Sequence, residues 1–327
     1  MPEPSPTSFP RGRLLRSGAA VVVLLALAGY LAVQYVTGGT GAPRCEVVSG
    51  KGDGASFEFS PEQAVNAAAI SAVGTARGMP ERAVTIALAT ALQESGLRNI
   101  RHGDRDSLGL FQQRPSQGWG TKKQIMDPTY AAGVFYEHLA KVTGYSRLPL
   151  TVAAQRVQRS GYPQAYAKHE PDATLLATAL TGRAAATLTC DGRPGADRTG
   201  GADSVRTALV RDFGRDVLQE AGEEVGAGAA ASPSPSPSPS TSDGSGSDRT
   251  VTVPVPTQTT AGTTLAQRGW ELAHWAVANS SALHIVRVSY AGRVWTAGNT
   301  DSKWRSAAPG KSGGAKADAV VRIVTGQ

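Results

Sequence analysis

Hydrophobic and polar positions between residues 45 and 190 follow the repeat expected of amphipathic helices. The first helix has Ser60 as its N-cap and Pro61 at its first helical position, and every segment of this kind ends at a glycine. Short strands are indicated only near Val47 and Phe57. The predicted helices span residues 60–78, 80–96, 127–144, 149–161 and 172–182.

Residues 264–327 show a different pattern, which predicts a small second module of helix and strand. Apolar positions repeat along one helical face, a hairpin is predicted around Ala291 and Gly292, and residues 318–325 predict a closing strand. Four of the five tryptophans lie here, where aromatic side chains usually build a core; a sugar-stacking surface is the alternative. The helical face holds Leu265, Gly269, Leu272 and Ala276, and the tryptophans are Trp270, Trp275, Trp295 and Trp304.

The segment between these two regions is poor in residues that could form a core. Residues 191–225 predict a connector that contains one isolated amphipathic helix. Residues 226–263 contain Ser-Pro repeats followed by a Pro/Thr-rich stretch, a composition typical of a disordered linker. The predicted fold class is therefore mainly α, with a small α+β module after the linker.

An uncharged apolar run covers residues 17–36 and is just long enough to span a bilayer. Arginines precede it, and no charge follows until Arg44, so residues 1–16 are predicted to be cytoplasmic and residues 37–44 to be an external tether. The alternative is a cleaved signal peptide that ends at the Ala-Leu-Ala of residues 26–28. The pattern predicts a single-pass plasma-membrane protein whose bulk is extracellular.

Charge and cysteine content narrow the class of protein further. The net charge of +7 suits an anionic bacterial envelope, and the absence of a Lys/Arg run interleaved with aromatics argues against nucleic-acid binding. Cys45 and Cys190 lie in the predicted exported part, where disulfides persist, so we expect them to pair; two free thiols are the alternative. The five histidines show no metal-ligand spacing, and the sequence calls for no cofactor or metal.

Glu94 is the most informative single residue, because it occupies the last turn of an apolar predicted helix that ends at Gly96. Burial of that helix and the negative end of its dipole both disfavour an ionised carboxylate and should raise the pKa of Glu94. A carboxylic acid of this kind suits a general acid. The alternative is an ordinary solvated glutamate. Small residues share the helical face that leads to Glu94: Ala83, Ala87, Thr90 and Ala91.

The residues around Glu94 resemble the lysozyme-like superfamily of lytic transglycosylases and goose-type lysozymes. Glu94-Ser95 matches the Glu-Ser that ends a core helix in that family, and residues 109–112, Gly-Leu-Phe-Gln, match its Gly-Leu-Met-Gln. Residues 103–105, Gly-Asp-Arg, are similar to a goose-type motif. The resemblance covers residues 60–190 and implies a lysozyme-like helical domain, here given the bounds 45–190.

Two departures from the family pattern affect the expected activity. Phe111 replaces the usual Met, which is an apolar exchange. Gln155 stands near the position where transglycosylases have a Tyr-Asn pair, which removes an aromatic hydroxyl beside the catalytic acid. Tyr162 and Tyr166 are alternative substitutes for that hydroxyl.

The resemblance implies that Glu94 protonates the glycosidic oxygen between N-acetylmuramic acid and N-acetylglucosamine. If Glu94 then activates the muramoyl C6 hydroxyl, the product is a 1,6-anhydro sugar. If Asp104 or Asp106 activates water, the chain is a hydrolase, and inverting geometry would place that carboxylate about 6.5–9.5 Å from Glu94. The alternative for both aspartates is a solvated loop with local ion pairs.

Further residues are candidates for substrate binding. Gln112 and Gln113 can hydrogen-bond acetamido groups, and Trp119 offers a flat face for a sugar; a turn glutamine pair and a core tryptophan are the alternatives. Ser95 orients a group in the cleft or caps the helix end. Gln155 and Tyr162 complete the predicted binding set.

Together these features predict a membrane-anchored peptidoglycan lytic enzyme, a lytic transglycosylase or a muramidase-type glycosidase. Its predicted partners are peptidoglycan glycan strands and, through one helix, the membrane; no protein partner is indicated. The alternative is a catalytically inactive cell-wall-binding or scaffolding protein on the same fold.

Overall fold

The computed structural model describes residues 24–26, 28–30, 43–162, 164–192, 201–218, 249–255, 263–298, 303–307 and 320–326. The chain divides into two compact units, Met1–Ala42 and Pro43–Gln327. The candidate site lies in the second unit, which is described below.

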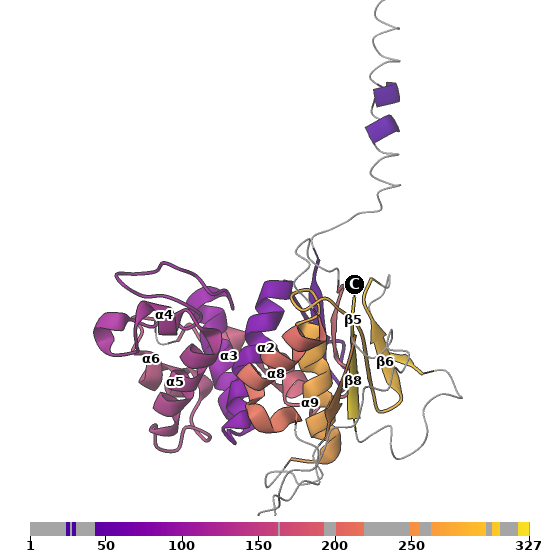
Figure 1. Ribbon diagram of the computed structural model, residues 1–327. Coiled ribbons are helices and arrows are strands. Elements are labelled where there is room, and N and C mark those ends of the chain that lie inside the picture. Colours follow the sequence, from indigo (N-terminus) through magenta and orange to yellow (C-terminus); the bar gives the residue numbers. More distant parts are fainter. Residues whose placement is uncertain are drawn as a thin grey trace, which may run out of the picture. The chain divides into compact units, whose positions relative to one another are not determined.

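Helices dominate the first part of this unit (Figure 1). Ser60 caps the first of them through a capping box with Gln63, as its sequence predicts. The helix predicted over residues 80–96 is also confirmed and ends at Gly96, whose φ of 62° is left-handed. The α-helices are α2 (Pro61–Ala76), α3 (Glu81–Ser95), α4 (Lys122–Ile125), α5 (Pro128–Ala140), α6 (Leu150–Gln158), α7 (Glu170–Leu180), α8 (Ala202–Phe213) and α9 (Leu265–Ala278); short 3₁₀ turns are η1 (Pro115–Gln117), η2 (Ala167–His169) and η3 (Arg215–Leu218).

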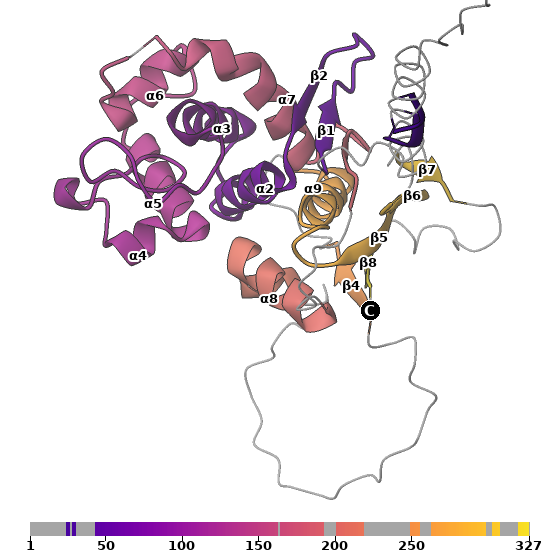
Figure 2. The same ribbon diagram turned by 90° about the horizontal axis from the view of Figure 1, so that it is seen from above.

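Helix α3 is the central element of the helical part. Figure 2 looks nearly along its axis, with α2, α5, α6 and α7 arranged around it, and α3 contacts all four. Every residue from Ala83 to Leu92 is buried, and small side chains alternate with larger ones, so neighbouring helices approach from all sides. Glu94 is therefore carried at the end of a rigid, enclosed helix.

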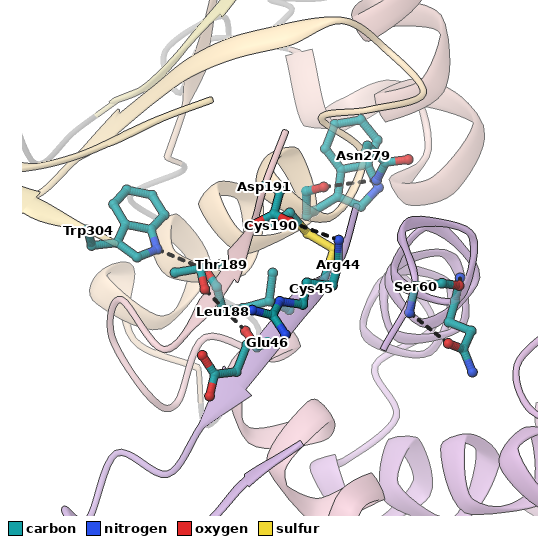
Figure 3. The surroundings of a disulfide bond; sticks show 12 residues. Arg44, Cys45, Glu46, Ser60, Leu188, Thr189, Cys190, Asp191, Asn279 and Trp304 are labelled. Atoms are coloured by element: carbon teal, nitrogen blue, oxygen red, sulfur yellow. Dashed lines mark hydrogen bonds between the residues drawn. A yellow bond between two sulfur atoms is a disulfide. The ribbon is translucent and has the colours of Figure 1, made fainter. Parts of the chain in front are cut away.

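Two antiparallel sheets flank the helices. The three-stranded sheet has the order β2-β1-β3 and is formed by β1 (Cys45–Val48), β2 (Ser56–Phe59) and β3 (Leu188–Cys190). Cys45 lies directly opposite Cys190 in this sheet, and the two form the predicted disulfide. Figure 3 shows that Trp304 approaches the same strand and donates to the Leu188 carbonyl oxygen at 2.9 Å.

The five-stranded sheet has the order β4-β8-β5-β6-β7. The predicted hairpin is confirmed: β5 and β6 are joined by Ala291 and Gly292, whose φ angles of 46° and 68° are both positive, as a tight two-residue turn favours. The strands are β4 (Thr250–Pro254), β5 (Ile285–Tyr290), β6 (Arg293–Thr296), β7 (Arg305–Ser306) and β8 (Val320–Thr325).

Helix α9 joins this sheet to the helical part. It contacts β5 and β8 of the sheet and also α2, α7 and β3. Figures 1 and 2 show α9 between α2 and the strands β5 and β8. Its Trp275 donates to buried Asp212 of α8 at 2.9 Å. The four tryptophans predicted to build a core are all buried. The C-terminal segment therefore packs in the same compact unit as the helices.

The predicted fold class, mainly α with one transmembrane helix, is wrong. The described residues form two antiparallel sheets as well as helices. Strand β4 lies within the predicted linker: its alternating Val251 and Val253 are buried against β8, although the Pro/Thr-rich composition suggested a linker. A strand this short is specified by its partner more than by its own composition. The rest of the predicted linker, 226–248 and 256–262, lies outside the described residues.

The predicted membrane span over residues 17–36 falls mostly outside the described residues. Among those that the structure describes, no helix has both the length and the apolar character needed to cross a bilayer.

Candidate active site

Glu94 is half-buried at the end of α3 and lines a cleft of about 780 Å³. Burial raises its pKa above the ordinary value, in the direction that its sequence position predicts. Two hydrogen bonds oppose this shift, one from the Tyr166 hydroxyl and one from the Gln158 side chain. Burial thus favours the protonated carboxyl group, and the Tyr166 and Gln158 hydrogen bonds stabilise the carboxylate.

Tyr166 supplies the aromatic hydroxyl that Gln155 cannot. Its hydroxyl donates to Glu94 Oε1 at 2.6 Å, and its side chain is completely buried. Burial and the adjacent Glu94 charge both raise the pKa of Tyr166, so the phenol remains a neutral donor. Tyr162 also lines the cleft, but it is 79% exposed. Of the two alternative tyrosines, the structure brings Tyr166 to the acid.

Ser95 ties the end of α3 to the Gly-Leu-Phe-Gln segment. Its hydroxyl donates to the Leu110 carbonyl oxygen at 2.8 Å, with the Ala91 carbonyl oxygen 3.0 Å away. Phe111 is fully buried and stacks on Phe135 with ring centroids 4.6 Å apart. Ser95 and Phe111 therefore position the cleft wall, and neither lines the cleft itself.

Glycines of the two matched motifs allow close packing beneath the cleft. Gly109 has a φ of 76°, and a Cβ there would lie 2.7 Å from the Ile125 carbonyl oxygen. A Cβ on Gly103 would collide with the side chains of Gln112 and Ser107. Glycine is required at Gly109 by its backbone, and at Gly103 it allows the Gln112 and Ser107 side chains to pack closely.

The predicted aspartates have different surroundings. Asp104 lines the cleft together with Glu94. Asp106 accepts from Arg114 Nε at 2.8 Å and from the Ser116 backbone N–H at 2.9 Å, and these bonds hold its pKa well below the usual range. Asp106 is absent from the cleft lining. Its carboxylate organises the loop, so Asp104 is the second carboxylate that the structure places beside Glu94 in the cleft.

The predicted glutamines divide in the same way. Gln112 and Gln113 line the cleft, and the buried Gln113 donates to the Ala131 carbonyl oxygen at 3.1 Å. The Oε1 atom of Gln113 is buried and has no hydrogen-bond partner among the described residues. Gln155 instead donates to the Ser160 carbonyl oxygen at 2.8 Å, just after α6, and is not in the lining.

Gln158 is a cleft residue of α6 that the sequence reasoning missed. Its Nε2 donates to the Phe111 carbonyl oxygen at 2.7 Å, and its side chain reaches Glu94. Its Oε1 is buried without a hydrogen-bond partner among the described residues. Gln158 follows the buried Ala154 by one helical turn, so it shares the inward face of α6. That spacing was a usable signal.

Trp119 lies at the cleft wall, half-buried, with its ring stacked on His138 at a centroid distance of 4.2 Å. Burial lowers the pKa of His138, and the neighbouring charges of Lys141 and Arg159 lower it further. The indole is thus held as a fixed flat surface by a largely neutral imidazole.

No protein-family model matches this chain, and a search of curated proteins found no similar sequence. Among the described residues, no three His, Cys, Asp or Glu side chains gather in a group that could hold a metal ion. The chemistry available to the described cleft is that of a carboxylic acid, a phenol, amides and cationic side chains.

Proposed function

We propose that this chain is a peptidoglycan lytic enzyme in which Glu94 is the general acid and base. The observation that carries the proposal is the contact between the Glu94 carboxyl and the buried Tyr166 hydroxyl inside the cleft. The lysozyme-like motifs around Glu94 agree with it. The substrate is the bond between N-acetylmuramic acid and N-acetylglucosamine.

In the first step, Glu94 transfers its proton to the glycosidic oxygen, and the bond from that oxygen to the muramoyl C1 breaks. Tyr166 donates to Oε1, so the proton that is transferred is carried by Oε2. The carboxylate formed is stabilised by the Tyr166 and Gln158 hydrogen bonds.

In the second step, Glu94 removes a proton and returns to its starting state. If the proton comes from the muramoyl C6 hydroxyl, the oxygen bonds to C1 and a 1,6-anhydro sugar leaves. This route needs no second carboxylate. If Asp104 instead takes a proton from water, the water oxygen bonds to C1 and the product has a reducing end; Asp104 then loses its proton to solvent and Glu94 regains one. Asp106 takes no part in either route, because Arg114 and Ser116 hold it outside the cleft lining.

A catalytically silent wall-binding protein on the same fold is the second candidate. The observation that favours it is the hydrogen bond from Arg114 to Asp106, which keeps Asp106 out of the cleft lining. Besides Glu94, Asp104 is then the one carboxylate that lines the described cleft. For either candidate, the Cys45–Cys190 disulfide supports a location outside the reducing cytoplasm.

Mass spectrometry of muropeptides released from purified sacculi tests the proposal, with Glu94→Gln compared with the wild type. Anhydro-muropeptides that vanish in the variant are expected for a transglycosylase, and reducing-end products that vanish indicate a hydrolase. Glu62→Gln is the matched control, because Glu62 is exposed on α2 and absent from the cleft lining. Sacculi that are bound but not cleaved by the wild type would leave the wall-binding candidate.

A further inference from the structure

The cleft that holds Glu94 is lined by more positive than negative side chains. Its carboxylates are Glu94 and Asp104. Neutral glycans, such as an unmodified N-acetylglucosamine polymer, offer no charge for such a surface to recognise. The cationic lining residues are Arg105, Arg114, Lys141, Arg156 and Arg159.

Most of these cations are not neutralised within the described structure. Arg114 is paired with Asp106 at 2.8 Å, but the other four form no ion pair with a described residue. Glu137, the acid next to His138, is itself paired with Arg77 at 3.1 Å. The unpaired charges therefore face solvent or a ligand in the cleft.

Two of the unpaired cations, Lys141 and Arg159, line the cleft together with the stacked Trp119 and His138 rings. Lys141 follows α5 and Arg159 follows α6, yet both act on His138, whose pKa they lower. His138 is stacked on Trp119. Trp119, Lys141 and Arg159 all line the cleft, so an indole face, an ammonium group and a guanidinium group from three separate segments face the same space.

We propose that Trp119, Lys141 and Arg159 form a subsite for a sugar that carries a carboxylate close to its ring. The indole face packs on the sugar, and the two cations bind the carboxylate, whose attraction is strengthened inside a concave site. The inference rests on the proposed function and refines it by assigning the cleft residues that recognise a carboxylate of the substrate. The lactyl group of muramic acid and the stem peptide attached to it are two sources of that carboxylate.

Binding to the full chain that carries Glu94→Gln tests the subsite without cleavage. The ligands are three forms of one purified glycan fragment: with stem peptides, with stem peptides removed by an amidase so that the lactyl carboxylate is free, and with all carboxylates capped as neutral methylamides. We expect capping to weaken the Kd about tenfold, as for two charge pairs at a partly enclosed surface, and 1 M salt to remove most of the difference. If removal of the stem peptides weakens binding, the stem peptide is the source of the bound carboxylate. If binding weakens only when the carboxylates are capped as methylamides, the lactyl group is the source.

The variant that carries both Lys141→Gln and Arg159→Gln should bind the glycan with free carboxylates and the capped glycan with equal Kd values. Lys122→Gln with Lys123→Gln is the matched control, because these exposed lysines of α4 lie outside the cleft lining and the same charge is removed. Equal binding of free and capped glycan by the parent chain would overturn the inference while leaving the proposed function in place. If the Glu94→Gln chain binds none of the three glycan forms and the wild type leaves sacculi uncleaved, both the inference and the proposed function would be overturned.

Discussion

At the scale of single residues, the character of Glu94 results from two opposed influences. Burial favours the protonated carboxyl, whereas the hydrogen bonds from Tyr166 and Gln158 favour the carboxylate. A group that must give a proton and take it back benefits from both. The hydrogen bond at 2.6 Å from Tyr166 is the part that a single substitution can remove.

Replacing Tyr166 by Phe should lower the cleavage rate about 10- to 100-fold, because a buried hydrogen bond to a charged group is lost. The pKa of Glu94 should rise further, since its carboxylate loses a donor. Activity that requires protonated Glu94 falls as pH increases through this pKa, so the basic limb of the pH–rate profile should move to higher pH.

The pH dependence of muropeptide release by the two chains measures this shift. Tyr162→Phe is the control for the position of the limb, because the Tyr162 side chain is exposed rather than bound to Glu94. A basic limb that stays in place, or moves to lower pH, in Tyr166→Phe would count against the assigned role.

Sequence reasoning singled out Glu94 but not all of its neighbours. The raised pKa of Glu94 followed from its place on an apolar helix, which local sequence defines. Gln158 and Tyr166 reach Glu94 only through the way α6 and the following turn fold back over α3. Such tertiary contacts leave at most a weak periodic signal in the sequence, as at Gln158.

At the scale of secondary-structure elements, the cleft depends on how α3 is joined to the Gly-Leu-Phe-Gln loop. Ser95 and the buried Phe111 make that junction, and Gly109 permits it through a left-handed backbone close to Ile125. A side chain at Gly109 meets two obstacles, its own backbone conformation and a neighbouring carbonyl.

Gly109→Ala should lower the free energy of unfolding by about 3 kcal/mol, from the left-handed penalty together with the steric conflict. Gly118→Ala is a matched comparison, since Gly118 has a φ of 80° but no atom within 4 Å of an added Cβ. It should cost about 1 kcal/mol. Urea unfolding of the two variants and the wild type gives both values; equal costs would show that contact with Ile125 is unimportant.

Elements with strong end signals were predictable, whereas short ones were not. The N-cap Ser60 with Pro61, and the glycine after α3, marked two helices correctly. Helix α4 has only four residues, and β3 has three, so neither is long enough to show a period. Strand β4 was assigned to the linker because Pro254 and the Pro/Thr-rich composition around it outweighed the alternation of Val251 and Val253.

At the scale of the whole folded unit, covalent and polar links join distant segments. The Cys45–Cys190 disulfide closes a sequence separation of 145 residues and sits in the three-stranded sheet. Next to it, the Arg44 backbone N–H donates to Asp191 at 3.1 Å (Figure 3). Removing the disulfide should therefore act mainly on the unfolded chain, while neighbouring contacts keep the native strands paired.

Replacing both Cys45 and Cys190 by Ser should lower the free energy of unfolding by about 4–5 kcal/mol in the chain-entropy description. Guanidinium unfolding measures the change. A reducing agent should destabilise the wild type by a similar amount and leave the double variant unaffected. A double variant as stable as the oxidised wild type would show that the sheet and its contacts alone hold these strands together.

His274 links the helical part to the C-terminal segment and should make their union sensitive to acid. It is fully buried on α9, with Nδ1 2.8 Å from the Ala179 carbonyl oxygen of α7 and Nε2 accepting from the Thr187 backbone N–H at 3.2 Å. These bonds require a neutral ring with its proton on Nδ1. Burial lowers the pKa of His274 from 6.5 to about 4.

Because the folded pKa lies below the unfolded one, this contribution to stability is complete above pH 6.5 and is lost as pH falls towards 4. The shift corresponds to about 3 kcal/mol.

His274→Asn can keep a donor near Ala179 but cannot titrate, so it should be less stable than the wild type at pH 7.5 and close to it at pH 4. Urea unfolding at both pH values tests this, with exposed His102→Asn as the control. The carboxylates titrate alike in the wild type and in both variants, so they do not account for a difference between them. If the free energy of unfolding of the wild type falls no more between pH 7.5 and pH 4 than that of His274→Asn, the buried imidazole does not make the fold sensitive to acid.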